Sequence, residues 1–265
     1  MTCLTEAHRV VRAYSTTWYE PVTSMPPGLG EAVTAAYLCM RGIDEVEDHP
    51  RLSGEAKARV LRGMSGAWQI RPGEAAFAAA VAGCEQSLPE VSLRLAEWTA
   101  LAPVEIAPRV CETFATMAER MAAWAETSFV IRSEPDLDRY TYAVAGTLVL
   151  LLSDLWQWHD GTTAHRGHGV GYGRFLQAVN ILIDRAEDID RGVDFWPDGW
   201  GEAEMAAYAR QELVSAEAYL AGLAPGPART FCAAPLARAK EAVRARPWVA
   251  TARKTRSRRG RKESG

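Results

Sequence analysis

Two stretches decide how this chain folds: YLCMRGIDEVEDH at residues 37–49 and NILIDRAEDIDRG at residues 180–192. Each starts as an apolar run with the period of a helix, and each ends in closely spaced acids. Crowding negative charge at the end of a buried helix face costs free energy unless something positive lies against it. The position of the acids therefore indicates one shared binding site.

Each stretch contains a pair of aspartates four residues apart, Asp44 with Asp48 and Asp184 with Asp188. Residues at this spacing lie on one face of a helix, about 6 Å apart along its axis. Two such pairs facing one cavity would repel each other unless a multivalent cation neutralised them. Because the pairs offer oxygen ligands alone, Mg²⁺ that bridges to phosphate oxygens fits them best.

Polar side chains continue both faces back toward the apolar run. Tyr37 and Arg41 precede the first pair at helical spacing, and Gln177 and Asn180 precede the second. Polar groups at the inward positions of apolar helices destabilise the fold unless a ligand satisfies them. The sequence thus predicts a cavity between two helices, with a polar wall that binds a ligand.

Most of the remaining chain also has helical periodicity. Apolar positions recur three and four apart over residues 29–48, 53–68, 73–84, 89–101, 103–127, 137–158, 171–190, 201–222 and 228–246. Pro and Gly separate these segments, and none alternates β-branched residues as a strand would. With 265 residues, 48% of them hydrophobic, the chain can form one sizeable core. We expect an all-α, single-domain helical bundle over residues 1–248 with a central active-site cavity.

The end of the chain differs in charge from the rest. From Val249 to Gly265 seven Lys or Arg residues accompany one Glu, so this segment carries +6 and the remainder −9, for a formal net charge of −3. Such a run is typical of a solvated, disordered tail, and no nucleic-acid-binding module accompanies it. We expect residues 249–265 to form a disordered tail and expect no nucleic-acid partner.

Composition also predicts where the protein works. The five cysteines show no metal-ligand spacing and fall mostly in apolar runs. The first residues, MTCLTEAHRVVRAY, lack the basic start and apolar core of a secretory signal. The longest apolar run, residues 142–156, contains Asp154 and is shorter than the roughly 20 residues that span a bilayer. These features predict a cytoplasmic protein with at most peripheral membrane contact.

Three motifs in order resemble the squalene and phytoene synthases, an all-α group within the isoprenoid synthase fold. YLCMRGIDEVED resembles the family's Y-x-x-x-R-x-x-D-x-x-x-D, YTYAVAGT its tyrosine-rich helix with Ala-Gly, and FLQAVNILIDRAEDIDRG its Q-x-x-N-I-x-x-D-x-x-x-D. AYSTTWYEPVTSMPP also looks like the segment that precedes the family's first motif. The resemblance covers residues 14 to 200.

This resemblance implies an allylic isoprenoid diphosphate held by Mg²⁺ between the two acid pairs. The implied metal ligands are Asp44, Asp48, Asn180, Asp184 and Asp188. The implied catalytic residues are Asp44, Asp48, Asp184, Asp188, Arg41 and Tyr37. The implied substrate-binding residues are Ser15, Tyr140, Ala145, Val149, Gln177 and Asn180.

Three positions depart from the family pattern. Ile183 stands where a basic residue usually precedes the second pair, and Ser15, Thr16 and Thr17 stand where a Ser-Lys-Ser element is usual. Val149 replaces the second glycine of A-G-T-x-G. Losing two cations and filling a groove argues against holding two diphosphates with two long chains.

These departures favour a Mg²⁺-dependent prenyltransferase that ionises one allylic diphosphate to an allyl cation and transfers the prenyl group to a small aromatic acceptor. Carbazole prenyltransferases of bacterial secondary metabolism resemble such an enzyme. The alternatives are head-to-head squalene- or phytoene-type synthesis, terpene cyclisation, and a helical scaffold without activity.

Aromatic walls would protect and stabilise such a cation. Tyr140, Tyr142, Trp156 and Trp158 are candidates, with ordinary core packing as the alternative for the two tryptophans. Three histidines in WHDGTTAHRGHGVGYG have no spacing that suits one helix face, so we expect a loop there rather than a metal cluster.

Overall fold

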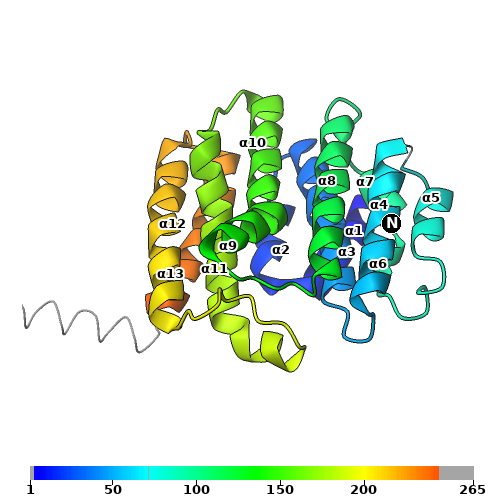
Figure 1. The fold of residues 1–265 in the computed structure, drawn as a ribbon. Coiled ribbons are helices and arrows are strands. Elements are labelled where there is room, and N and C mark those ends of the chain that lie inside the picture. The colour runs from blue at the N-terminus through cyan, green and yellow to red at the C-terminus, as the bar shows by residue number, and fades with distance from the viewer. Residues whose placement is uncertain (1–2, 71, 245–265) are drawn as a thin grey trace, which may run out of the picture.

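The structure is a computed structural model that describes residues 3–70 and 72–244. Within these ranges the regular elements are helices and no strand occurs, which confirms the predicted all-α, single-domain fold (Figure 1). The predicted basic tail at residues 249–265 lies outside the described residues.

The helices follow one another with short connections. In chain order they are α1 (Cys3–Tyr14), α2 (Thr16–Thr23), α3 (Leu29–Glu47), α4 (Gly54–Ile70), α5 (Glu74–Ala80), α6 (Glu90–Leu93), α7 (Leu95–Thr99), α8 (Ala107–Glu126), α9 (Glu134–Thr141), the π-helix η1 (Tyr142–Gly146), α10 (Thr147–Asp160), α11 (Arg166–Asp190), α12 (Glu202–Gly222) and α13 (Pro227–Arg244).

Helix α3, which carries the first acid pair, is the centre of one half of the bundle. It packs against α1, α2, α4, α6, α7, α8 and α10, and 14 of its 19 residues are buried. Its N-terminus is capped by Glu31, whose carboxylate accepts a hydrogen bond from the Gly28 backbone N–H at 2.6 Å. Gly42 allows a close crossing, because a Cβ there would lie 2.7 Å from Leu95 Cδ2 and 3.0 Å from the Val91 carbonyl.

Helix α11, which carries the second pair, is the centre of the other half and packs against α9, η1, α10, α12 and α13. Residues 166–170, which were expected to belong to a loop ahead of the helix predicted over 171–190, form the first turn of α11. The loop was wrongly predicted there because the glycines of this segment serve packing: a Cβ on Gly169 would lie 3.1 Å from Tyr219 Cε2, and a Cβ on Gly171 would lie 2.3 Å from Ser215 Cβ. A Cβ on Gly173 would lie 2.7 Å from the Ala145 backbone carbonyl. The missing side chains let neighbouring backbones approach α11.

The helix predicted over residues 137–158 is interrupted. Its middle, Tyr142–Gly146, winds as a π-helix between α9 and α10. A π turn adds a residue to the helix and often marks a functional site. This one presses against Gly173 of α11, so it sets how near α11 lies to the rest of the bundle.

Other bounds also differ from the prediction. Residues 89–101 form two short helices, α6 and α7, and the helix expected over 73–84 ends at Ala80, ahead of Gly83 with its left-handed φ of 80°. Helices α1 and α2 were not predicted. Among the described residues no helix is both long enough and apolar enough to span a bilayer.

Helices α10 and α11 stand on one side of the molecule and α4 and α8 on the other, with α2 and α3 between them (Figure 1). Helix α3 contacts α2 and α10, while α11 contacts η1 and α10. The inner faces of α3 and α11 therefore look toward each other across a space that α2, η1 and α10 border.

Candidate functional site

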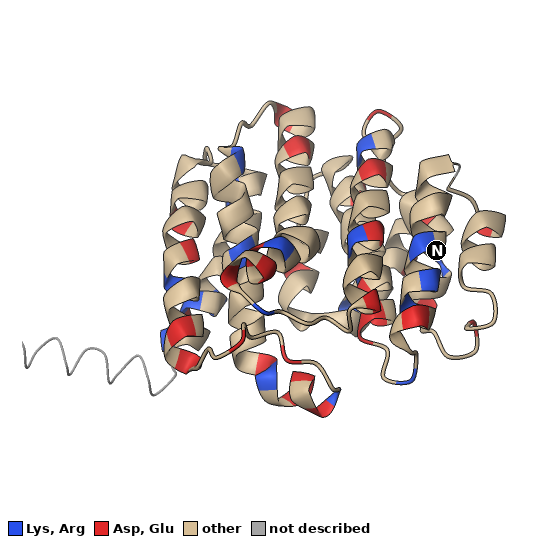
Figure 2. Ribbon diagram, in the orientation of Figure 1, with Lys and Arg blue, Asp and Glu red and all other residues tan. Residues whose placement is uncertain are grey.

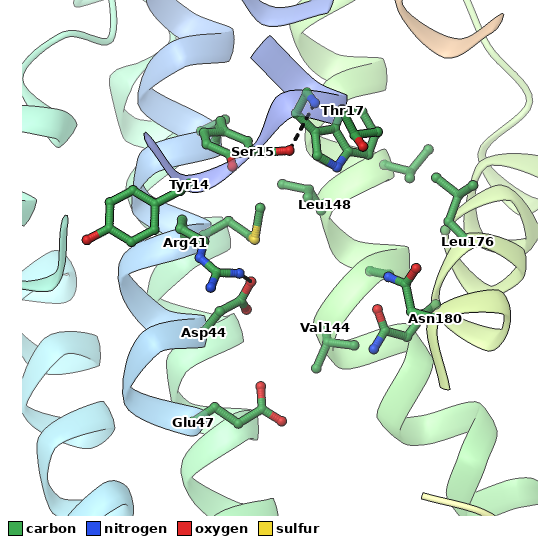
Figure 3. Close-up of a pocket in the computed structure, with 18 of the residues that line it drawn as sticks. Tyr14, Ser15, Thr17, Arg41, Asp44, Glu47, Val144, Leu148, Leu176 and Asn180 are labelled. Atoms are coloured by element: carbon green, nitrogen blue, oxygen red, sulfur yellow. Dashed lines mark hydrogen bonds and ion pairs between the residues drawn. The ribbon is translucent and has the colours of Figure 1, made fainter. Parts of the chain in front are cut away.

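A cavity of ≈ 470 Å³ fills that space. All twelve residues predicted for the site line it: Ser15, Tyr37, Arg41, Asp44, Asp48, Tyr140, Ala145, Val149, Gln177, Asn180, Asp184 and Asp188. Figure 3 shows Arg41, Asp44 and Glu47 on one wall, across the cavity from Leu176 and Asn180. The structure thus brings the predicted residues together, while their individual roles stay predictions.

The first acid pair stands on the wall made by α3. Arg41 lies 3.9 Å from Asp44 through Nη1 and donates from Nε to Glu45 at 2.9 Å. Burial raises the pKa of Asp44 to about 7, with Arg41 opposing the rise and Asp48 and Glu45 adding to it. This wall therefore holds more negative charge than its arginine neutralises, which is a place for a further cation.

The second pair reaches the same end of the cavity from α11. Asp188 is buried, and burial raises its pKa against the opposing effect of Arg191. Arg191 directly follows α11 and forms ion pairs with Asp188 and, at 2.6 Å, with Asp48, the C-cap residue of α3. Figure 2 shows acidic and basic residues next to one another on the last turns of α11. One guanidinium thus joins the two acid pairs.

Sequence analysis missed two charged residues at this end, Glu47 and Arg191. Glu47 is buried and accepts a 2.9 Å hydrogen bond from the Tyr140 hydroxyl. Burial first, and then Asp48 and Asp44, raise its pKa well above the ordinary range. Glu47 lies three residues after Asp44, so helical spacing could have found it, whereas Arg191 lies past the helix end, where spacing gives no signal.

Ser15 and Tyr37 line the cavity near the start of α2. The Ser15 hydroxyl caps α2 by accepting from the Trp18 backbone N–H at 3.0 Å. Burial raises the pKa of Tyr37 to about 12, so its hydroxyl stays protonated and can donate a hydrogen bond at neutral pH. The polar wall is thus partly held in place by its own structural bonds.

Apolar and aromatic side chains line the rest of the cavity. They include Trp18, Val22, Val33, Leu148, Val149, Leu152, Tyr172, Phe195 and Phe231. Tyr140 stacks on Phe195 with ring centroids 4.7 Å apart, and both face the cavity. The cavity therefore has a charged end and an apolar remainder, as an amphiphilic ligand requires.

Three of the four predicted wall aromatics lie elsewhere. Trp156 lies one turn beyond Leu152, and its ring centroid is 5.4 Å from that of Phe231. Leu152 and Phe231 line the cavity, whereas Trp156 does not. Tyr142 belongs to the π turn and packs under the Arg120 guanidinium, and Trp158 is on another face of α10. Of the four, Tyr140 is the one that lines the cavity.

The donor set fits Mg²⁺, because carboxylate and amide oxygens surround the charged end and the raised carboxyl pKa values of Asp44 and Asp188 are those that a cation would lower. The described residues hold no group of three or more His, Cys, Asp or Glu side chains close enough to bind a metal by themselves. Phosphate oxygens of a ligand would complete such a site. The rings of His165 and His168 stack with centroids 3.9 Å apart, and neither residue lines the cavity.

The model of the squalene/phytoene synthase family matches residues 11–204. The chain belongs to this family. It is 26% identical to squalene synthase of Schizosaccharomyces pombe over 245 residues, which cover 81% of this chain and 53% of that protein. It is 26% identical to 15-cis-phytoene synthase of Synechocystis over 220 residues, covering 78% and 58%. The chain thus spans about half the length of the relatives it matches.

Solved structures show the same fold. The complex of TcSQS with the ligand E5700 superposes with a TM-score of 0.76 at 20% identity, covering 91% of this chain and 78% of that one. A dehydrosqualene synthase superposes with a TM-score of 0.63 at 17% identity, covering 90% and 84%. The expected isoprenoid synthase fold is confirmed. Because the relatives named here are squalene and phytoene synthases, they add no support to a resemblance to carbazole prenyltransferases.

Proposed function

We propose that this protein is a Mg²⁺-dependent transferase that joins two prenyl diphosphates head to head. One observation carries the proposal: two acid pairs from separate helices meet at one end of a cavity whose remainder is apolar and aromatic. Squalene and phytoene synthases generally ionise diphosphates with a divalent metal and take a second prenyl unit. This choice reverses the preference for an aromatic acceptor, because the family match favours the head-to-head reaction.

The proposed metal ligands are the four aspartates of the pairs together with Asn180. Bound there, Mg²⁺ would supply a Lewis acid for departure of the diphosphate. Arg41 lies beside Asp44, where its guanidinium can hydrogen-bond a diphosphate oxygen. Tyr37, with its hydroxyl protonated, offers a further donor on the same wall.

The apolar part of the cavity would take the prenyl chains. Val33, Leu148 and Leu152 offer no hydrogen-bond partners, so they exclude water from the carbon that loses diphosphate. The rings of Tyr140 and Phe195 face the same space, and an aromatic face attracts a cation within about 6 Å. These walls favour capture of the allylic cation by a second carbon chain over capture by water.

Transfer to an acceptor that carries no diphosphate is the second candidate. Among the described residues that line the cavity, Arg41 and Arg191 are the basic ones, and both already pair with carboxylates. Ile183, which lies on α11 beside the second pair, brings no charge. A second diphosphate would therefore find few counter-ions in this cavity.

A product assay separates these reactions. The protein is incubated with Mg²⁺ and geranyl, farnesyl or geranylgeranyl diphosphate, alone and with a panel of aromatic acceptors, and products are identified by mass spectrometry. A hydrocarbon with twice the carbon number of the substrate, formed without acceptor, supports the proposal. Product only with an acceptor establishes the second candidate, and a hydrocarbon of single chain length indicates cyclisation. Recovery of intact substrate under all conditions would contradict every one of these functions.

A further inference from the structure

Arg191 is the one side chain that ties the two acid pairs together among the ion pairs of the described residues. Its Nη1 lies 2.6 Å from Asp48 Oδ1, and its Nη2 hydrogen-bonds Asp188 Oδ1. The Asp188 side chain is 6% exposed, while those of Arg191 and Asp48 are 37% and 42% exposed. The guanidinium therefore uses one oxygen from each helix, from the same carboxylates that the proposed metal needs.

Among the described residues, the ion pairs of Arg191 are those with Asp48 and Asp188. Arg191 also borders a second, small cavity of ≈ 90 Å³ that contains Glu47 and Lys57. Lys57 is a basic residue whose Nζ donates to the Glu47 backbone carbonyl at 2.5 Å. Glu47 itself is buried and accepts a 2.9 Å hydrogen bond from the Tyr140 hydroxyl, so its carboxylate already has a partner.

A cation that binds Asp48 and Asp188 must compete with this guanidinium. Carboxylate oxygens bound to Mg²⁺ cannot keep two charge-assisted bonds to an arginine at full strength. Once released, Arg191 would face Lys57, which repels it, and the diphosphate, which attracts it bidentately. Metal binding alone thus costs the Arg191 ion pairs, whereas metal binding with diphosphate replaces them.

We infer that Arg191 is a positioning residue that occupies the two acid pairs in the metal-free protein and transfers to the diphosphate when Mg²⁺ takes them, so that metal and diphosphate bind cooperatively. This inference rests on the proposed function, because it requires the aspartates to bind metal and the cavity to bind a diphosphate. It names a basic residue for a site that has lost cations at Ile183 and Thr16 relative to the family pattern.

The test compares wild type, Arg191→Gln and a control that loses the same charge from the same region. Arg185→Gln is that control, because Arg185 pairs with Asp194 at 2.8 Å and stacks on Trp196, away from the cavity. Melting temperatures are measured in EDTA and in Mg²⁺. We expect Mg²⁺ to raise the melting temperature of Arg191→Gln by more than that of wild type or the control, since no internal cation has to be displaced.

Binding is then measured by calorimetry, first with Mg²⁺ alone and then with inorganic pyrophosphate in saturating Mg²⁺. For Arg191→Gln we expect Mg²⁺ to bind roughly fivefold more tightly and pyrophosphate roughly fivefold more weakly, as suits two partly exposed ion pairs. Changes of opposite sign are the signature, because damage to the fold weakens both. Arg191→Lys keeps the charge and loses the bidentate guanidinium, so its affinities for Mg²⁺ and pyrophosphate should lie between those of wild type and Arg191→Gln.

The outcomes separate the two claims. Weakening of both ligands, or no change in either, would overturn the role of Arg191 while leaving the proposed function intact. A wild-type protein whose melting and pyrophosphate binding do not respond to Mg²⁺ would overturn the proposed function and this inference together. A lower melting temperature of Arg191→Gln in EDTA alone, with equal Mg²⁺ responses, would reduce Arg191 to a structural ion pair.

Discussion

Helices α3 and α11 carry the same pattern of paired acids in different surroundings. Helix α3 has 14 of its 19 residues buried, with helices around most of its circumference, whereas α11 has 10 of 25 buried and exposes Ile189 and Ile183 in its last turns. The first pair therefore stands on a wall fixed by packing on nearly all sides. The second stands near the exposed end of a helix that packs against α9, η1, α10, α12 and α13, with glycines at its closest crossings.

The largest expected effect is a loss of turnover when the first acid pair, on α3, is changed. Asp44→Asn keeps the size of the side chain but removes a metal ligand and the charge that balances Arg41. We expect turnover of the prenyl diphosphate to fall by roughly a hundredfold or more, as when a preorganised electrostatic group is lost. The far-ultraviolet circular dichroism should stay that of wild type, because Asn removes repulsion from Asp48 and Glu45.

The matched control is Asp190→Asn, which removes the same charge from an exposed position outside the cavity. It should leave turnover close to that of wild type. Equal losses in the two variants would mean that the effect is one of overall charge, and normal turnover in Asp44→Asn would remove Asp44 from the metal site.

The next effect tests how α11 is held. In Gly173→Ala the new Cβ would meet the Ala145 backbone at 2.7 Å, and backbone cannot yield as a side chain can. We expect unfolding to require about 2 to 3 kcal/mol less free energy, as for overpacking in a tight core. Gly42→Ala in α3 should cost less, because the nearest atom, Leu95 Cδ2, is the end of a flexible side chain.

Gly66→Ala in α4 supplies the control for helix propensity, since nothing lies within 4 Å of its Cβ. It should stabilise the protein by about 0.5 to 1 kcal/mol. The measurement is chemical denaturation of all three variants. If Gly42→Ala proved the most destabilising, the contrast between a fixed α3 and an α11 held by close glycine contacts would be reversed.

The parts of the fold and site that the sequence could predict are those that depend on local helical spacing. Both acid-bearing helices follow from local periodicity, and helical spacing alone places Tyr37, Arg41, Gln177 and Asn180 on the cavity wall. The all-α fold follows because no segment alternates as a strand. Spacing also implied Glu47, three residues after Asp44, although we did not draw that conclusion from the sequence.

Contacts between segments far apart in the chain were not predictable from such local rules. The first turn of α11 has the composition of a loop, and its packing against α12 depends on contacts such as Gly169 with Tyr219, which lie far apart in the chain. Arg191 lies past the end of α11, so no periodicity links it to Asp48. Trp156 contacts Phe231 of α13, and Phe231 rather than Trp156 lines the cavity.

A smaller effect concerns the hydrogen bond that joins α9 to α3. Tyr140→Phe keeps the ring that stacks on Phe195 and removes the hydroxyl that donates to Glu47. We expect a loss of about 1 to 2 kcal/mol in the free energy of unfolding, since a buried carboxyl loses its partner. Tyr208→Phe, which removes a hydroxyl bonded to Thr141 and Asp138 outside the cavity, is the control for activity.

Both variants should lose stability, and only Tyr140→Phe should also change KM for the prenyl diphosphate, because Glu47 faces the cavity. Denaturation and steady-state kinetics measured side by side make the distinction. An unchanged KM in Tyr140→Phe would show that this bond supports α3 without affecting the bound substrate.

The smallest expected effect tests whether the more exposed helix can accept a cation. Ile183 is 37% exposed and directly precedes Asp184, so an arginine there can reach the charged end without displacing core side chains. A single partly exposed charge contributes up to about 1 kcal/mol, so Ile183→Arg should bind inorganic pyrophosphate in Mg²⁺ roughly threefold more tightly. Ile183→Gln adds length without charge and should not. If the glutamine variant gained as much, polarity rather than charge would be what α11 lacks; if neither gained, Arg41 and Arg191 already supply the counter-ions that one diphosphate needs.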